Sequence, residues 1–226
     1  MSAFSKGMAN LTQVVSILVM RWWVRFAFRG SIRRVGPLPS GACVYASNHR
    51  SFADPPFVAC WSRVPVAFFA RSNLWDIPVI RQCLQLFDGI PVDRDNPGIS
   101  SMKGAVERLR QGMPILVFPE GTRTRSGRVG PLRDGPALFA RRAGVPLIPV
   151  YLYRSESVWP RGCPIPLWWG RRVEIRFGRP IVPPPGLDPR SSDAWVTKRL
   201  ALWMQVQERS LGSKLPSVNR PPRNAP

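Results

Sequence analysis

The sequence contains only one histidine, His49, and its four cysteines, at positions 43, 60, 83 and 163, form no C-x-x-C pair. Zinc sites are built from several histidine, cysteine or carboxylate ligands, and the usual sets cannot be assembled from this chain. We therefore expect no metal site and no other cofactor. Cysteines without paired spacing also favour a reduced protein on the cytosolic side.

Acidic residues are scarce as well. The chain has 13 of them against 33 lysines and arginines, which gives a formal net charge of +20, and none precedes Asp54. So large an imbalance favours an anionic partner. An anionic membrane, a nucleic acid and a phosphorylated substrate all fit this charge.

The first part of the chain lacks an apolar run of membrane-spanning length. The strongly apolar stretch runs only from Val14 to Met20, whereas a spanning helix needs about 20 apolar residues. A secretory signal peptide fits poorly, because the arginines follow the apolar stretch and no A-x-A-like cleavage site comes after it.

Residues 1–35 instead have the pattern of a cationic amphipathic helix. Arginines at 21, 25 and 29 would form one stripe, while tryptophans and other apolar residues cover much of the remaining surface. Such a helix lies in the membrane interface, on the cytoplasmic face of the inner membrane, in a peripheral or monotopic protein. The residues expected to contact this anionic membrane are Arg21, Trp22, Trp23 and Arg25. The alternative is an apolar helix packed on its own domain.

From Gly36 onward the pattern is that of an α/β domain, and 226 residues fit one domain better than two. Short apolar runs predict strands over residues 42–46, 64–70, 115–118, 147–153 and 173–177. Helices are expected from Asp54, over 99–110, over 133–142, and from a cap at Ser192 and Asp193 to about Leu211. This alternation predicts a single mixed-sheet domain with flanking helices over residues 36–211, and a disordered tail over 212–226.

The only histidine lies in the segment Asn48-His49-Arg50-Ser51-Phe52-Ala53-Asp54, where a predicted strand ends and a helix begins. A neutral imidazole can take a proton from an alcohol near physiological pH, and a carboxylate that fixes its tautomer improves it as a base. His49 and Asp54 would form such a dyad if the loop between them folds back. Alternatively, Asp54 only caps the helix, with Pro55 in its first position, and His49 is an ordinary loop residue.

A second segment, Phe118-Pro119-Glu120-Gly121-Thr122-Arg123, directly follows an apolar run. A glycine lets the backbone approach a ligand, and ligands tend to bind at strand ends of α/β sheets. Further arginines follow at 125, 128 and 133, which suits the segment to a phosphate. The alternative is a basic surface loop.

Two weaker patterns accompany these segments. Arg94 ends the segment Gly89-Ile90-Pro91-Val92-Asp93-Arg94, where its guanidinium could bind a phosphate through two hydrogen bonds or pair with a surface carboxylate. The segment Val145-Pro146-Leu147-Ile148-Pro149-Val150 is an apolar strand with two prolines, which alone indicates only a core or edge strand.

Together and in this order, the four segments resemble the glycerophosphate and lysophosphatidate acyltransferase family. That family carries an NHxxxxD block, a glycine-to-arginine block, FPEGTR and an apolar VPxxPV block, and this chain has all four between Asn48 and Val150. The ordered set is far more specific than any single motif. The resemblance implies an O-acyltransferase that moves a fatty acyl group from acyl-CoA or acyl-carrier protein to 1-acyl-glycerol 3-phosphate, forming phosphatidic acid.

The resemblance also implies roles for individual residues. His49 matches the general base and Asp54 its orienting partner. The acceptor phosphate is expected to contact Arg94, Glu120, Gly121, Thr122 and Arg123, and the acyl or donor side is expected to be lined by Val145, Pro146, Leu147, Ile148 and Pro149. Many relatives have lysine and aromatic residues where this chain has Leu132, Arg133 and Asp134, a departure that concerns the acceptor's specificity and not the reaction class.

Other functions fit less well. The same chemistry would serve another lyso-lipid acceptor, such as a lysophospholipid, a lyso-ornithine lipid or glycerol 3-phosphate. A nucleic-acid-binding protein should interleave its arginines with base-stacking aromatics, whereas the tryptophans here cluster in apolar runs, so we expect no nucleic-acid partner. A lipid hydrolase would also use a histidine and a carboxylate, but the sequence has no G-x-S-x-G elbow.

Overall fold

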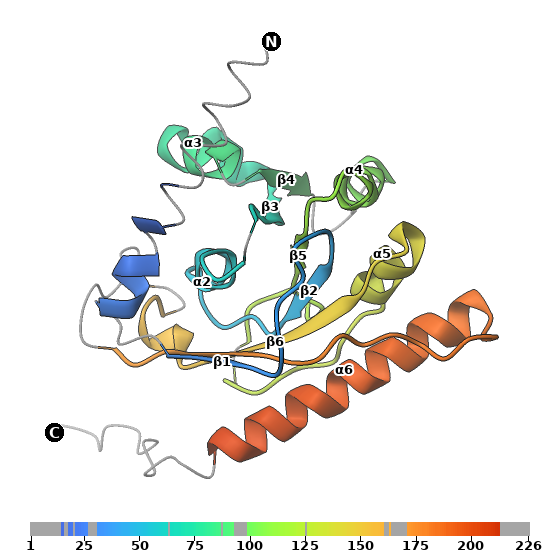
Figure 1. The fold of residues 1–226 in the computed structure, drawn as a ribbon. Helices are drawn as coiled ribbons and strands as arrows, with labels where there is room; N and C mark the ends of the chain where they lie inside the picture. Colours follow the sequence, from blue (N-terminus) through green and yellow to red (C-terminus); the bar gives the residue numbers. More distant parts are fainter. Residues whose placement is uncertain are drawn as a thin grey trace, which may run out of the picture.

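The computed structural model describes residues 15, 18–19, 21–26, 31–62, 64–86, 88–92, 99–124, 126–160, 163 and 171–212. Seven strands in this part of the chain form one sheet (Figure 1). They are β1 (Ser31–Arg34), β2 (Val44–Ser47), β3 (Ala67–Arg71), β4 (Gly89–Val92), β5 (Ile115–Val117), β6 (Leu147–Tyr153) and β7 (Glu174–Phe177). Their order across the sheet is β1-β7-β6-β2-β5-β3-β4, and neighbours are parallel except β6 and β7. The predicted mixed sheet in an α/β fold is confirmed.

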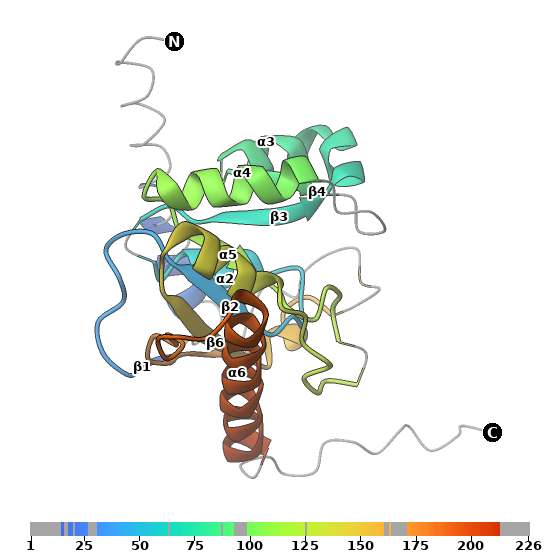
Figure 2. The same ribbon diagram turned by 90° about the vertical axis from the view of Figure 1, so that its right-hand side faces the viewer.

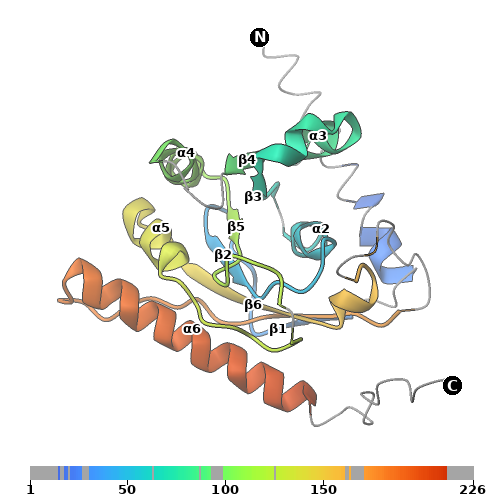
Figure 3. The same cartoon turned by 180° about the vertical axis from the view of Figure 1, so that it is seen from behind.

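Helices cover both faces of the sheet. They are α2 (Asp54–Ala59), α3 (Pro78–Leu86), α4 (Ile99–Arg110), α5 (Gly135–Ala143) and α6 (Pro189–Gly212), with single turns η1 (Ser72–Asp76) and η2 (Ser155–Ser157). The backbone is also helical at residues 15, 18–19 and 21–26. Figure 2 shows α4, α5 and α6 following one another along one face, and Figure 3 shows α2 on the opposite face.

The two faces have separate cores because successive side chains of a strand point to opposite sides. In β2, Tyr45 packs in the core that includes Phe57 of α2 and Val24 of the N-terminal helical residues. Its neighbours Val44 and Ala46 pack instead in the core under α4, α5 and α6. Burial on both faces explains why the central strands are continuous apolar runs without alternating polar residues.

The strand order brings two loops together. β2 pairs with β5 on one side and with β6 on the other, all in parallel. Because parallel strands end at the same edge of a sheet, the segment 48–53 after β2 and the loop of residues 118–134 after β5 emerge side by side. This edge is where α/β sheets bind ligands.

Local signals in the sequence place several elements well. The predicted helix over 99–110 coincides with α4, and the predicted strand over 147–153 coincides with β6. α5 starts two residues later than expected and ends, as expected, near Gly144, which has a left-handed backbone with φ of 67°. Glycine adopts this conformation without steric cost and is the usual residue after a helix end.

The start of α6 differs from the prediction. The helix begins at Pro189, because the side chain of Asp188 accepts hydrogen bonds from the backbone N–H groups of Arg190 and Ser191 at 2.9 and 3.2 Å. Ser192 and Asp193 lie within the first turns and do not cap it. Proline suits the first helical turn, since its missing N–H would have no intrahelical partner there.

The sheet also begins earlier than the predicted domain boundary. β1 lies within residues 1–35 and pairs in parallel with β7, with Ser31 opposite Glu174. Its sequence, Ser-Ile-Arg-Arg, has a single apolar residue, so no apolar run indicates a strand there. The predicted tail after Gly212 lies outside the described residues.

Candidate active site

Directly after β2, the side chain of Asn48 forms the hydrogen bonds that a strand backbone would otherwise form. Asn48 donates from Nδ2 to the carbonyl oxygen of Leu152 at 3.0 Å, and its Oδ1 accepts the N–H of Leu152 at 2.7 Å. These bonds extend the β2–β6 ladder one step beyond the last backbone pair, Ser47 with Val150. The backbone itself is thereby free to turn, and the next residue, His49, starts the loop at the carboxyl edge of the sheet.

The loop folds back and joins His49 to Asp54. The distance from His49 Nδ1 to Asp54 Oδ2 is 2.8 Å, and the carboxylate is fully buried. The same oxygen accepts the backbone N–H groups of Arg50 at 2.6 Å and Ser51 at 2.7 Å. Three donors compensate the buried negative charge.

This geometry decides between the two interpretations of Asp54. The residue before α2 is Ala53, and no side chain caps the helix. Asp54 turns away from the free N–H groups of the helix and points into the preceding loop. With Nδ1–H donated to the carboxylate, a neutral imidazole carries its lone pair on Nε2, where it can accept a proton.

Phe118 orients the imidazole ring from its other side. The rings of His49 and Phe118 stack with centroids 3.9 Å apart and planes 16° from parallel. The His49 side chain is 12% exposed. Because Asp54 fixes one nitrogen and Phe118 fixes the ring plane, the direction of Nε2 is set by two separate contacts.

Glu120 holds the backbone of His49. Its Oε1 accepts the N–H of His49 at 2.9 Å, and its Oε2 accepts the N–H of Gly130 at 3.0 Å. The carbonyl oxygen of His49 in turn accepts the N–H of Thr124 at 2.8 Å. Burial raises the pKa of the Glu120 carboxyl, although these two hydrogen bonds and nearby cationic groups oppose the shift. The sequence analysis assigns Glu120 to the acceptor phosphate. Both carboxylate oxygens, however, already accept backbone hydrogen bonds, and a carboxylate repels a phosphate because both are negatively charged.

The neighbours of Glu120 form the turn and its outer rim. Gly121 has φ of 69°, a conformation that strains other residues, and its N–H bonds the carbonyl oxygen of Phe118 at 3.0 Å. Thr122 is exposed. The Arg123 guanidinium lies 3.5 Å from the ring centre of Phe52, which joins the second block to the first through a cation–π contact.

The predicted donor-side residues 145–149 are not brought to His49. Arg94 lies outside the described residues. Val145 and Pro146 precede β6, at the amino edge of the sheet, where the Pro146 carbonyl oxygen accepts the N–H of Val44 at 3.0 Å. Leu147 and Ile148 are each 1% exposed, and they lie in different cores. Pro149 of β6 lies opposite Ala46 of β2, and its carbonyl oxygen accepts the N–H of Gly178, which follows β7. A donor-side role for this segment stays a prediction.

The N-terminal helical residues pack on the domain with one side and expose the other. Arg21 donates to the backbone carbonyl groups of Cys60 and Ser62, and so it binds its own domain, contrary to the predicted lipid contact. Trp23 packs against the core beside the buried Val24. On the other side Arg25 is exposed, and Trp22 stacks on Phe26 at 4.2 Å with 69% of its surface accessible. Among the described residues, no helix is both long and apolar enough to pass through a bilayer.

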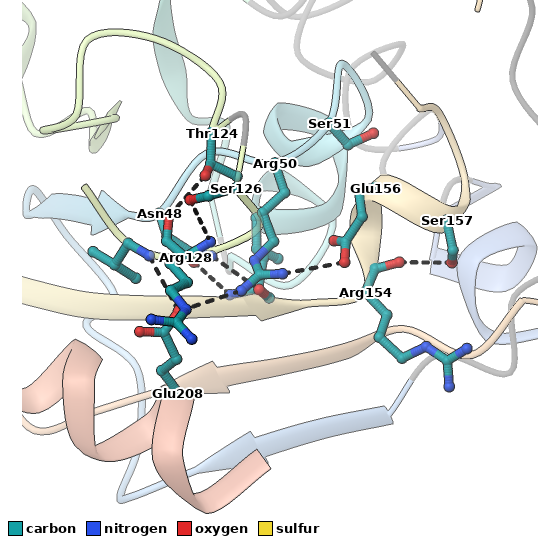
Figure 4. Close-up of polar contacts among 12 residues, drawn as sticks. Asn48, Arg50, Ser51, Thr124, Ser126, Arg128, Arg154, Glu156, Ser157 and Glu208 are labelled. Carbon is teal, nitrogen blue, oxygen red and sulfur yellow. Dashed lines mark hydrogen bonds and ion pairs between the residues drawn. The ribbon is translucent and has the colours of Figure 1, made fainter. Parts of the chain in front are cut away.

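Arg50 is a site residue to which the sequence analysis gives no role. Its buried guanidinium donates to Glu156 Oε1 of η2 (Figure 4) and to the Tyr151 hydroxyl of β6, both at 3.1 Å. Burial alone would lower its pKa, but Glu156, Tyr151 and Glu208 outweigh that effect and raise it. In the sequence, only its position next to His49 indicates that Arg50 belongs to the site, because its hydrogen-bond partners are about 100 or more residues away.

The sequence is similar to those of known acyltransferases. A family model described as Acyltransferase matches residues 26–153. A chloroplastic 1-acyl-sn-glycerol-3-phosphate acyltransferase of Brassica napus is 31% identical over 139 residues, which are 60% of this chain and 40% of that protein. A 1-acyl-sn-glycerol-3-phosphate acyltransferase of Pseudomonas aeruginosa is 26% identical over 84% of this chain and 80% of its own length.

The fold is similar to a solved structure as well. The crystal structure of the 1-acyl-sn-glycerophosphate (LPA) acyltransferase PlsC from Thermotoga maritima gives a TM-score of 0.70 at 20% identity, over 95% of this chain and 91% of that one. This likeness concerns the fold alone. The family model, however, spans more than half of the 226 residues and includes the His49 segment and the loop of residues 118–134. The chain therefore belongs to the acyltransferase family.

Proposed function

We propose that the protein transfers a fatty acyl chain from a thioester donor to the hydroxyl of 1-acyl-glycerol 3-phosphate, forming phosphatidic acid. The observation that carries this proposal is the 2.8 Å contact of His49 with the buried Asp54. It lies in the block that resembles the family's catalytic motif. The names of the curated relatives support the acceptor. The donor is acyl-CoA or acyl-carrier protein.

His49 acts as the general base. Nε2 takes the proton from the acceptor hydroxyl while the hydroxyl oxygen attacks the thioester carbonyl. The tetrahedral intermediate collapses, the carbon–sulfur bond breaks, and the departing thiolate takes the proton back from the imidazolium. Asp54 holds the imidazole tautomer and stabilises the transient positive charge, so no covalent acyl-enzyme is needed.

Cationic side chains on the loop that contacts His49 support a phosphorylated acceptor. Arg123, Arg128 and Arg133 all lie on the loop of residues 118–134, which contacts the His49 backbone through the Thr124 N–H and the Glu120 carboxylate. An arginine binds a phosphate through two parallel hydrogen bonds, which fixes the acceptor's orientation as well as its position. Arg94 is the fourth cation that we assign to the phosphate.

The N-terminal helical residues are proposed to hold the enzyme on the cytoplasmic face of an anionic membrane. Their exposed side chains are large and apolar, and each is at least half accessible: Val15, Leu18, Val19, Trp22 and Phe26. Arg25 is exposed beside them. Apolar burial in the interface together with cationic attraction to lipid phosphates is the usual basis of such binding.

Product identification tests the proposal. The purified full chain is mixed in anionic vesicles with labelled acyl-CoA or acyl-carrier protein and one of four acceptors: 1-acyl-glycerol 3-phosphate, glycerol 3-phosphate, a lysophospholipid or a lyso-ornithine lipid. We expect labelled phosphatidic acid as the main product. A different labelled lipid would support acyl transfer but would show that the acceptor is another molecule. Free fatty acid alone would overturn the transferase assignment in favour of a thioesterase.

A further inference from the structure

Glu208 reaches the active-site loops from outside the matched family region. The family model ends at residue 153, whereas Glu208 lies near the carboxyl end of α6 (Pro189–Gly212). Figure 4 shows its side chain directed at the loop that carries Thr124, Ser126 and Arg128. Its side chain is 28% exposed.

The first contact of Glu208 is with the backbone of that loop. Its Oε1 accepts the N–H of Val129 at 3.1 Å. The next N–H along the chain, that of Gly130, goes to Glu120 Oε2 at 3.0 Å, and Glu120 Oε1 holds the N–H of His49. Two successive backbone amides are thus held by two carboxylates, one from α6 and one that also binds His49.

The second contact is with Arg50, the residue after His49. Glu208 Oε1 lies 3.8 Å from Arg50 Nη2. The Arg50 backbone N–H binds Asp54 Oδ2, so this arginine is tied to the catalytic dyad as well. The loop also passes near the guanidinium, because a methyl group added at Gly127 would lie 3.9 Å from Arg50 Nη1.

We propose that Glu208 is a positioning residue for acyl transfer. It fixes the loop of residues 118–134 on Arg50, and in this way fixes the loop's cationic side chains relative to His49. Glu208 acts through the loop and Arg50 and does not touch the substrate. Its kinetic readout depends on the proposed function, whereas its effect on the loop is measurable without turnover.

Two substitutions separate the contacts of Glu208. Glu208→Ala removes both, and small displacements of reacting groups cost roughly 10- to 100-fold in rate. We expect the loss to appear as a lower kcat and a higher KM for the lipid acceptor, with the donor KM little changed. Glu208→Gln keeps an oxygen for the Val129 N–H and loses only the charge facing Arg50, so it should recover most of the activity.

Asp193→Asn is the matched control on the same helix. Asp193 of α6 forms two 2.8 Å hydrogen bonds with Arg141 of α5, well away from the loop. This variant should melt at a lower temperature and keep the wild-type kcat and acceptor KM.

Hydrogen exchange of the peptides that contain Val129 and Gly130 gives a readout independent of catalysis. Exchange should become faster in Glu208→Ala, change little in Glu208→Gln, and stay unchanged in Asp193→Asn. Unchanged exchange in folded Glu208→Ala, or unchanged kcat and acceptor KM, would overturn the positioning role. A wild-type chain without any transfer activity would count against the proposed function instead, and the exchange result would still decide the structural claim.

Discussion

Asp54 holds both the His49 imidazole and the backbone of the loop before α2. Its Oδ2 accepts the His49 ring N–H and the two backbone N–H groups of Arg50 and Ser51. The backbone bonds make the loop turn back, and that turn brings the imidazole to the carboxylate. Removing the charge alone should therefore affect the reaction more than the fold.

We expect Asp54→Asn to lower kcat by at least about 100-fold while the protein remains folded, because an amide cannot stabilise the imidazolium and can favour the wrong tautomer. The measurement is kcat together with the melting temperature. Asp193→Asn, which removes a carboxylate that pairs with Arg141 between α6 and α5, is the matched control and should leave kcat unchanged. Full activity in Asp54→Asn would mean that the carboxylate serves the loop only.

Glu120 serves two backbone donors at once, which a carboxylate can do and a carboxamide cannot. In Glu120→Gln, one of the N–H groups of His49 and Gly130 would face an NH2 group. We expect a lower kcat and a protein that still folds. Glu107→Gln on the exposed side of α4 is the matched control, since Glu107 bonds only a nearby glutamine side chain.

The raised pKa of Glu120 adds a pH dependence to the same comparison. At a pH between the ordinary carboxyl pKa and the raised pKa of Glu120, the folded protein binds more protons than the unfolded chain. The contribution of Glu120 to stability is therefore full below the ordinary range and is lost as the pH rises through the raised pKa. On acidification into this window, the wild type should gain stability relative to Glu120→Gln. Parallel stability curves for the two proteins would contradict the shifted pKa.

The contact between His49 and Asp54 was easier to predict from the sequence than the residues that hold these two in place. His49 and Asp54 could be predicted because they lie five residues apart in one recognisable block. Arg50, Glu156 and Glu208 could not, because their contacts depend on β6, η2 and α6 folding onto the loop. The position of Val145 and Pro146 at the far edge of the sheet likewise follows from strand direction, which no local pattern reveals.

Among the elements, the N-terminal helical residues present two different faces. Arg21, Trp23 and Val24 pack on the domain, while Trp22 and Phe26 stack on each other in solvent. An exposed aromatic pair beside an exposed arginine has no role in the core. It is suited to the headgroup region of a membrane.

We expect the double variant Trp22→Ala, Phe26→Ala to bind anionic vesicles at least roughly tenfold more weakly, because each side chain loses apolar burial of about 1.5–3 kcal/mol. Its melting temperature should change little. Co-sedimentation measures the binding, with Leu202→Ala on the exposed face of α6 as a matched control. Wild-type binding by the double variant would remove these two residues from the membrane contact.

Elements were predictable where the signal was local. α4 and β6 have long, regular apolar patterns and α5 has a glycine stop, so they could be located from the sequence. β1 has one apolar residue among four and owes its existence to its neighbour β7. The start of α6 was harder to predict, because Asp188 and Ser192 both have side chains that can cap a helix, and the cap is Asp188.

At the scale of the whole molecule, the fold places His49 and Asp54 at the carboxyl edge of a sheet that is covered on both faces. Alternating apolar runs and helices were enough to predict a mixed α/β sheet. The strand order was not predictable, because it depends on which distant strands pair. That order matters for function, since the pairing of β2 with both β5 and β6 brings His49, Glu120 and Arg50's partners together.

The central claim is that His49 is the base for acyl transfer, and its substitution by alanine tests it most directly. The chain has no second histidine to take its place, and a general base contributes on the order of 10²–10⁴-fold to a rate. The measurement is kcat for His49→Ala with labelled donor and acceptor in vesicles, beside the melting temperature of the same sample. The account predicts a folded protein with kcat reduced by that factor. A folded His49→Ala protein that turns over at nearly the wild-type rate would contradict it.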